Sequence, residues 1–78
     1  MIDCIIASSN KTTVYKDLQS VILPGFFGQI EILPTHTELF TLIKDGEIVI
    51  QRLQKKLETV KVSDGECYIK DDIVNIIL

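Results

Sequence analysis

The sequence predicts an all-β fold: an antiparallel β-sandwich of about ten short strands in two sheets. Apolar residues recur at every second position, turn residues separate these runs at short intervals, and β-branched Ile and Val dominate while Trp is absent. Successive side chains of a strand face opposite sides, so each alternating run indicates a strand with one buried face. The clearest runs are Ile2–Ala7, Leu18–Leu23, Gln29–Ile32, Glu47–Gln51 and Glu66–Lys70.

Turn signals lie between these runs. Asp45-Gly46 and Asp64-Gly65 each separate two apolar runs, and Asp-Gly favours the positive φ of a tight hairpin. Asp71-Asp72 marks another turn before the last run. The best helical candidate is Thr37–Lys44, but it is short and fits a strand equally well. Evenly spaced strands with such turns are typical of a sandwich or a barrel.

The middle of the chain is interrupted by Pro24-Gly25, Gly28 and Pro34. Proline is tolerated at strand ends or edges, and glycine supplies conformational freedom, so we expect backbone roles at these positions and no chemistry.

Chain length and net charge exclude several classes of function. With 78 residues, one domain spanning residues 1–78 is expected. The net charge of −3 and pI of about 4.9 argue against nucleic acid as a partner. No segment approaches the length of a membrane span, and the start lacks the features of a secretory signal, so direct membrane insertion is not expected. We expect a cytoplasmic protein, or one held at the cytoplasmic side of a membrane by its partners.

The residues for catalysis or cofactor binding are sparse. His36 is the only histidine, and no nucleophile motif surrounds any serine. Cys4 and Cys67 have no metal-ligand spacing, so we expect small buried residues in a reducing compartment, although the sequence also allows a disulfide. The cations Arg52 and Lys55-Lys56 are expected to be solvated surface charges. We therefore predict no catalytic residue, no metal and no cofactor, and binding or structural work.

One stretch carries a resemblance. Leu23–Leu39 contains Pro-Gly, two further residues, Gly, then Ile-Leu-Pro and a His after one more residue. This pattern resembles the epsilon subunit of bacterial F-type ATP synthase, called delta in mitochondria. The similarity runs without a gap from about Leu18 to Leu78 and more loosely back to Ile2. It covers the N-terminal β-sandwich domain, and we expect either a naturally short form or a chain cut before the family's C-terminal helical domain, whose inhibitory role is not carried over.

The resemblance implies a central-stalk rotor subunit that links the gamma subunit to the membrane c-ring, so that ion-driven rotation is coupled to ATP synthesis. It implies a peripheral position on the cytoplasmic side of the bacterial inner membrane. Phe26, Phe27 and Gln29 are expected at the c-ring, and Thr35 and His36 at gamma. Two structural alternatives stay open: a phenylalanine ring closes the end of the core, or the histidine only satisfies backbone groups of a turn.

Three other functions remain as alternatives. The chain could be a small β-domain that binds a ligand or a peptide without a rotary complex. It could be a carrier domain modified at Lys55 or Lys56, which intact mass would reveal. A standalone enzyme is the least favoured, because one histidine and no metal site offer little chemistry.

Overall fold

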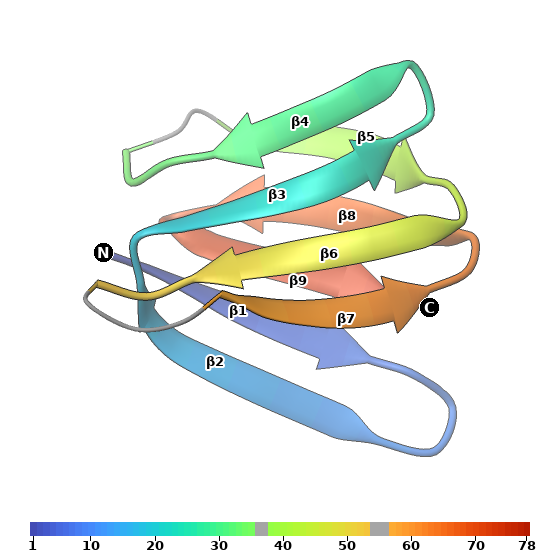
Figure 1. Ribbon diagram of the computed structural model, residues 1–78, viewed down its shortest axis with the longest axis horizontal. Coiled ribbons are helices and arrows are strands. Elements are labelled where there is room, and N and C mark those ends of the chain that lie inside the picture. The colour runs from blue at the N-terminus through green and yellow to red at the C-terminus, as the bar shows by residue number, and fades with distance from the viewer. Residues whose placement is uncertain (36–37, 54–56) are drawn as a thin grey trace.

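The computed structural model describes residues 1–35, 38–53 and 57–78, which form nine strands and no helix (Figure 1). The predicted all-β fold is therefore confirmed, with nine strands in the described part. Within these ranges no helix is long and apolar enough to cross a membrane. In chain order the strands are β1 (Ile2–Ala7), β2 (Thr12–Leu18), β3 (Ser20–Gly25), β4 (Gly28–Ile32), β5 (Leu39–Ile43), β6 (Gly46–Gln51), β7 (Glu58–Val62), β8 (Gly65–Lys70) and β9 (Ile73–Ile77).

The strands form two facing layers that belong to one curled sheet. The hydrogen-bonded order is β2-β1-β9-β8-β5-β3-β6-β7, and β4 is added beside β3. The layers meet where β3 pairs β5, through the single pair Gly25↔Ile43. A Cβ at Gly25 would lie 2.6 Å from the Gly28 carbonyl oxygen, so the corner has no room for a side chain. The expected sandwich is present, but its two sheets are continuous at this corner.

The core lies between the layers and is built from the period-two positions. On β1, for example, Ile2, Cys4 and Ile6 are buried while the residues between them are partly exposed. Both layers contribute large aliphatic side chains, which gives the close-packed interior of a rigid body. The least exposed of them are Leu18, Val21, Leu23, Ile32, Ile43, Ile48, Ile50, Ile69, Val74 and Ile76.

One pairing departs from the antiparallel prediction. The first strand, β1, and the last strand, β9, run parallel, with Cys4 opposite Val74. A parallel pair needs a long connection, and here the whole intervening chain provides it. The pairing places the first and the last strand of the chain side by side in one layer.

The two Asp-Gly turns are not hairpins, and these two predictions are wrong. β5 pairs with β8 rather than β6, and β7 pairs with β6 rather than β8, so each turn joins different layers. Glycine is required at Gly46 and Gly65 because a side chain would clash with its neighbours, and not because the backbone has a positive φ there. A Cβ at Gly46 would lie 2.9 Å from Pro24 Cβ, and one at Gly65 would lie 2.7 Å from the Ile77 carbonyl oxygen. Among the described glycines only Gly28 has a positive φ, of 130°.

Two tight hairpins with two-residue turns occur in the described structure, β3–β4 and β8–β9, and the second has a left-handed turn. Its turn residues Asp71 and Asp72 have φ values of 53° and 59°. Two consecutive left-handed residues make a type I′ turn, whose twist matches that of paired strands. Aspartate tolerates this conformation better than most residues with a side chain.

The two cysteines are buried free thiols. They lie on β1 and β8, with β9 between them, and both face the core. Burial, with a smaller contribution from the nearby Cys67, raises the pKa of Cys4 to about 12, and burial raises the pKa of Cys67 to about 12. Both therefore act as small apolar residues, as the sequence predicts, and they are not joined in the structure.

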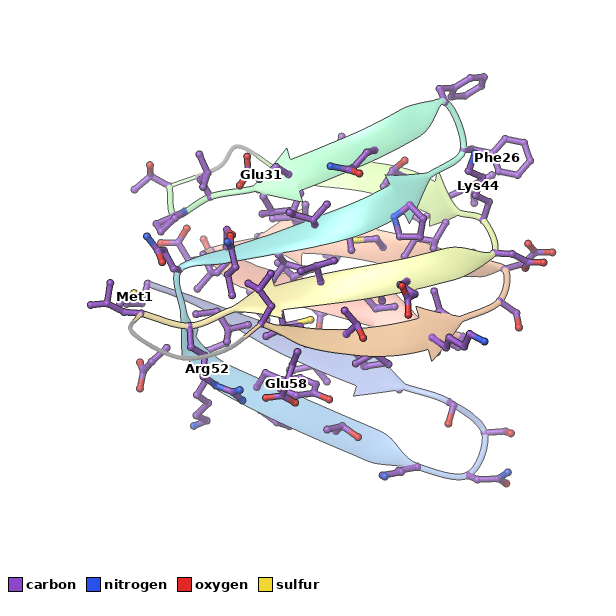
Figure 2. All side chains as sticks on the ribbon, in the orientation of Figure 1. Met1, Phe26, Glu31, Lys44, Arg52 and Glu58 are labelled. Atoms are coloured by element: carbon purple, nitrogen blue, oxygen red, sulfur yellow. The ribbon has the colours of Figure 1, made fainter. Side chains whose placement is uncertain are left out.

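A cluster of polar side chains joins the two ends of the ladder, β2 and β7. Arg52, which follows β6, makes an ion pair with Glu58 at the start of β7 (Figure 2). The Arg52 guanidinium carbon also lies 5.6 Å from the centre of the Tyr15 ring on β2. Burial and the Glu58 charge raise the pKa of Tyr15. Arg52 is thus not a simple solvated charge, as the sequence suggested, but a link across the open side of the sandwich.

Candidate functional site

The predicted contact residues that the structure describes lie at opposite ends of the sandwich. The β3–β4 turn, with Phe26 and Phe27, is at the end where the chain also terminates (Figure 1). Thr35 lies at the other end, beside the β8–β9 hairpin. The structure therefore separates the two predicted contacts by the length of the strands.

The β3–β4 turn presents two aromatic rings to solvent. Phe26 is 56% exposed and Phe27 is 102% exposed, so the alternative that one ring closes the core is wrong. The two rings meet edge to face with centroids 6.0 Å apart. The Phe26 amide donates a hydrogen bond to the Leu42 carbonyl oxygen at 3.2 Å, which holds the turn against β5. We call Phe26 and Phe27 the aromatic tip.

Gln29 belongs to the same region. It is exposed near the start of β4, where it pairs with Pro24 of β3. Its side chain is free to contact a surface that also meets the aromatic tip.

Thr35 is held by its backbone. It has a positive φ of 65°, and its amide donates a hydrogen bond of 2.7 Å to Oδ1 of Asp72. The carboxylate of the β8–β9 hairpin thus fixes the backbone at Thr35, and it leaves the Thr35 side chain exposed. His36 lies outside the described residues, as do Lys55 and Lys56, so the roles predicted for these three stay predictions.

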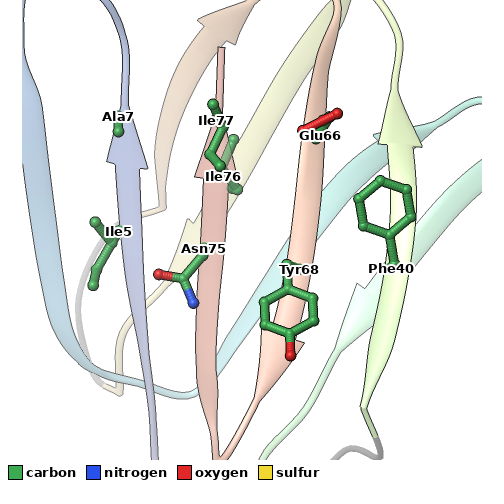
Figure 3. Close-up of a pocket in the computed structure, with 8 residues that line it drawn as sticks. All are labelled: Ile5, Ala7, Phe40, Glu66, Tyr68, Asn75, Ile76 and Ile77. Atoms are coloured by element: carbon green, nitrogen blue, oxygen red, sulfur yellow. The ribbon is translucent and has the colours of Figure 1, made fainter.

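A second exposed surface was not among the predicted sites. Ile5, Phe40, Tyr68 and Ile77 face outward from β1, β5, β8 and β9, and we call them the apolar flank (Figure 3). Phe40 is 59% exposed, Tyr68 42% and Ile77 55%. Phe40 and Tyr68 are direct cross-strand partners. The sequence signal is that β5, Leu-Phe-Thr-Leu-Ile, has apolar residues on both alternating faces.

The apolar flank surrounds a shallow groove of about 530 Å³. Its polar lining residues are Glu66 and Asn75, and the rest of the lining is aliphatic or aromatic. Exposed apolar patches with a polar rim are typical of protein-binding surfaces. Among residues 1–35, 38–53 and 57–78, no three His, Cys, Asp or Glu side chains are grouped as metal ligands would be. The exposed apolar flank and its polar rim suit binding to another protein.

Comparison with known proteins agrees with this geometry. The chain is 30% identical over 76 residues to an ATP synthase epsilon chain of Psychrobacter arcticus, an alignment that covers 97% of this chain and 55% of that relative. It is 38% identical over 61 residues to an ATP synthase epsilon chain of Campylobacter concisus, covering 78% of this chain and 47% of that relative. The chain thus spans about half the length of these curated relatives.

Two solved structures share the fold. A chain in the Euglena gracilis mitochondrial ATP synthase structure of OSCP, F1 and c-ring superposes with a TM-score of 0.87 at 14% identity, covering 97% of this chain and 49% of that chain. A chain in the Tetrahymena thermophila mitochondrial ATP synthase structure of the central stalk and c-ring gives 0.81 at 8% identity, covering 97% and 61%. The sequence profile of the ATP synthase delta/epsilon chain β-sandwich domain matches residues 1–78. The chain therefore belongs to the ATP synthase delta/epsilon chain β-sandwich domain family.

Proposed function

We propose that this chain is a central-stalk rotor subunit of an F-type ATP synthase, which links the gamma subunit to the membrane c-ring. The observation that carries the proposal is that one rigid body exposes two separate apolar surfaces, the aromatic tip and the apolar flank. A coupling element needs both stiffness and two interfaces. The curled sheet with its close-packed core supplies the stiffness.

The aromatic tip and Gln29 are the proposed c-ring contact. Phe27 is fully exposed at one end of the molecule, where burial against a partner removes a large apolar area from water. Exposed aromatics of this kind act as anchors when a partner surrounds them. The adjoining Gln29 adds hydrogen-bonding capacity for the polar groups of a loop.

The apolar flank and the loop that contains Thr35 and His36 are the proposed gamma contact. Phe40 is the second residue of β5, and its cross-strand partner Tyr68 lies on β8, the strand that leads into the hairpin whose Asp72 binds the Thr35 amide. A durable interface needs about 800 Å² from each partner, which calls for more surface than a short turn. The apolar flank offers additional apolar area, and Asp72 holds the backbone of Thr35.

The chain is proposed to do no chemistry itself and to sit peripherally on the cytoplasmic side of a bacterial inner membrane, held there by these partners. The surfaces that support the proposal are apolar, and they suit burial against protein rather than proton transfer or bond cleavage. Catalysis then belongs to other subunits of the complex.

A pair of crossed variants tests the proposal. Phe40→Ser is expected to weaken binding of the cognate gamma subunit at least about tenfold while c-ring binding is unchanged, because one aromatic anchor is lost. Phe27→Ser is expected to weaken c-ring binding by a similar factor and to leave gamma binding intact. Each variant is the control for the other, and both replace exposed side chains, so the fold should persist. Gel filtration with gamma and capture on purified c-ring measure the two effects.

Two results would contradict the assignment. A wild-type chain that forms no complex with gamma at micromolar concentration argues against a rotor role. Equal loss of both partners in both variants means that the two surfaces are not separate interfaces. A stable monomer that ignores both partners but binds a small apolar ligand in the flank groove supports the alternative of a ligand-binding β-domain.

A further inference from the structure

The outer edge of β4 is the least protected strand edge in the described structure. β4 pairs with β3 alone among the described residues. β2 carries Lys16 and the left-handed Asp17, with φ of 57°, and β7 carries Lys61 and begins at the ion-paired Glu58. Charged side chains, above all lysine, and β-bulges help to keep strand edges from pairing with another chain, and the β1–β2 ladder has such an irregularity. β4, with the sequence Gly-Gln-Ile-Glu-Ile, has no lysine, no proline and no non-glycine residue with positive φ.

The backbone of β4 directs two residues toward this open edge. Pro24 is opposite Gln29, has no amide hydrogen, and accepts a hydrogen bond from the Lys44 amide at 3.0 Å on its other side. Pro24↔Gln29 is therefore a non-hydrogen-bonded pair. Because such pairs alternate along an antiparallel ladder, Ile22↔Glu31 is one too. The amide and carbonyl groups of Gln29 and Glu31 then point away from β3, toward solvent.

We propose that two copies of this chain pair through β4, antiparallel, with a two-fold axis at Ile30. In this register each Gln29 lies opposite Glu31 of the other copy, so the four outward-facing residues form two hydrogen-bonded pairs. The side chains are also complementary, because an amide meets a carboxylate at both positions. A C2 interface of this kind uses the same patch on both copies.

Neighbouring registers are less favourable. A shift of two residues in one direction places Glu31 opposite Glu31, and like charges directly opposite are destabilising. A shift of two in the other direction places Glu31 opposite Phe27. A shift of one residue turns the core-facing side of one copy to the same side as the solvent-facing side of the other. It also places Ile30 opposite Gln29 or Glu31, which are polar. The proposed register is thus the one of these that avoids opposed like charges and keeps the core-facing residues of both copies on the same side.

The same register accounts for two exposed apolar side chains. Phe27 of one copy comes opposite Leu33 of the other at each end of the paired strands. Leu33 is 50% exposed and Phe27 is 102% exposed in the single chain. Covering these four side chains adds apolar burial to the backbone hydrogen bonds. The interface is nevertheless small, so the dimer is expected to be weak and concentration-dependent.

This dimer is a state of the free chain and goes beyond the proposed rotor function. It occupies Gln29 and Phe27, which the rotor function assigns to the c-ring, so the dimer and the rotor complex exclude each other. Its test needs neither gamma nor the c-ring, and its failure leaves the rotor proposal intact.

Sedimentation equilibrium of the isolated chain, from about ten micromolar to about one millimolar, measures the dimer. Gln29→Glu puts two carboxylates opposite each other twice, and it is expected to raise the dissociation constant about tenfold. Gln29→Glu combined with Glu31→Lys places opposite charges at both positions, and it is expected to restore dimerisation to the wild-type level or better. Circular dichroism checks that each variant keeps its strands. Amide exchange should slow at Gln29 and Glu31 as the concentration of the wild-type chain rises.

Three results would overturn the proposal. The first is a wild-type chain that stays monomeric up to about one millimolar. The second is a dimer whose dissociation constant is unchanged by Gln29→Glu. The third is a double variant that fails to restore dimerisation, because this would show that the register is not the one described. A dimer lost in Phe40→Ser but not in Gln29→Glu would assign self-association to the apolar flank and equally reject β4.

Discussion

The polar cluster across the open side of the sandwich leads to a quantitative prediction. Arg52→Ala removes both the ion pair with Glu58 and the contact with the Tyr15 ring. The side chains of Arg52 and Glu58 are 30% and 48% exposed, so the ion pair contributes only about 0.2–1 kcal/mol. A guanidinium beside a partly buried aromatic ring near the surface adds about 0.5–1 kcal/mol. We expect Arg52→Ala to lower the free energy of unfolding by about 0.7–2 kcal/mol.

A double-mutant cycle measured by urea unfolding separates the two contacts. Glu58→Gln removes the charge but keeps the shape, and the coupling energy with Arg52→Ala should be about 0.5 kcal/mol and should shrink with added salt. Tyr15→Leu removes the ring, and its coupling with Arg52→Ala should be similar but insensitive to salt. For a domain of this size, 1 kcal/mol corresponds to a fall in Tm of about 4–8 °C, so thermal unfolding gives an independent value.

Two results would contradict a stabilising role for Arg52: a change in the free energy of unfolding below about 0.3 kcal/mol on Arg52→Ala, or two coupling energies that are both zero within error. Either result would mean that Arg52 is a solvated charge and that the two ends of the ladder, β2 and β7, are held by the core alone. Lys61→Ala is a matched control, because it removes an exposed cation from β7 without touching this cluster.

Three further predictions concern the core and the turns. Gly46→Ala should destabilise the fold by about 1–3 kcal/mol in urea unfolding, because its new methyl group overlaps a proline ring 2.9 Å away. The raised pKa values of Cys4 and Cys67, about 12 against 9.0, keep both thiols neutral in the folded chain after they ionise in the unfolded one. Stability should therefore fall from pH 9 toward pH 12, by up to about 1.4 kcal/mol per pH unit for each thiol, and replacing either cysteine by alanine should flatten this slope. Asp72→Gly keeps the positive φ but removes the acceptor of the Thr35 amide, so amide exchange at Thr35 should accelerate while the β8–β9 pairing persists.

Part of the candidate site could be predicted from the sequence. The contact role of Phe26 and Phe27 was expected from the family resemblance, while the residue pattern left open whether a ring closes the core; the structure exposes both rings. The apolar flank was not predicted from the sequence. Phe40 and Tyr68 lie in strands whose other face is also apolar, and a single alternating pattern does not say which face meets the core. The pairing of β5 with β8 decides this, because it turns Phe40 and Tyr68 outward together.

The sequence by itself determined the local features: strands from the period of two, turns from Asp, Gly and Pro, and buried thiols from isolated cysteines in apolar runs. These features depend on residues only a few positions apart, whose types set the local backbone conformation and the direction of each side chain. Only the tertiary structure decided which strands pair, since the β1–β9 contact and the corner at Gly25 join residues far apart in sequence. Long-range pairing is chosen by the packing of the whole core, and both the two separate surfaces and the open edge of β4 arise from that choice.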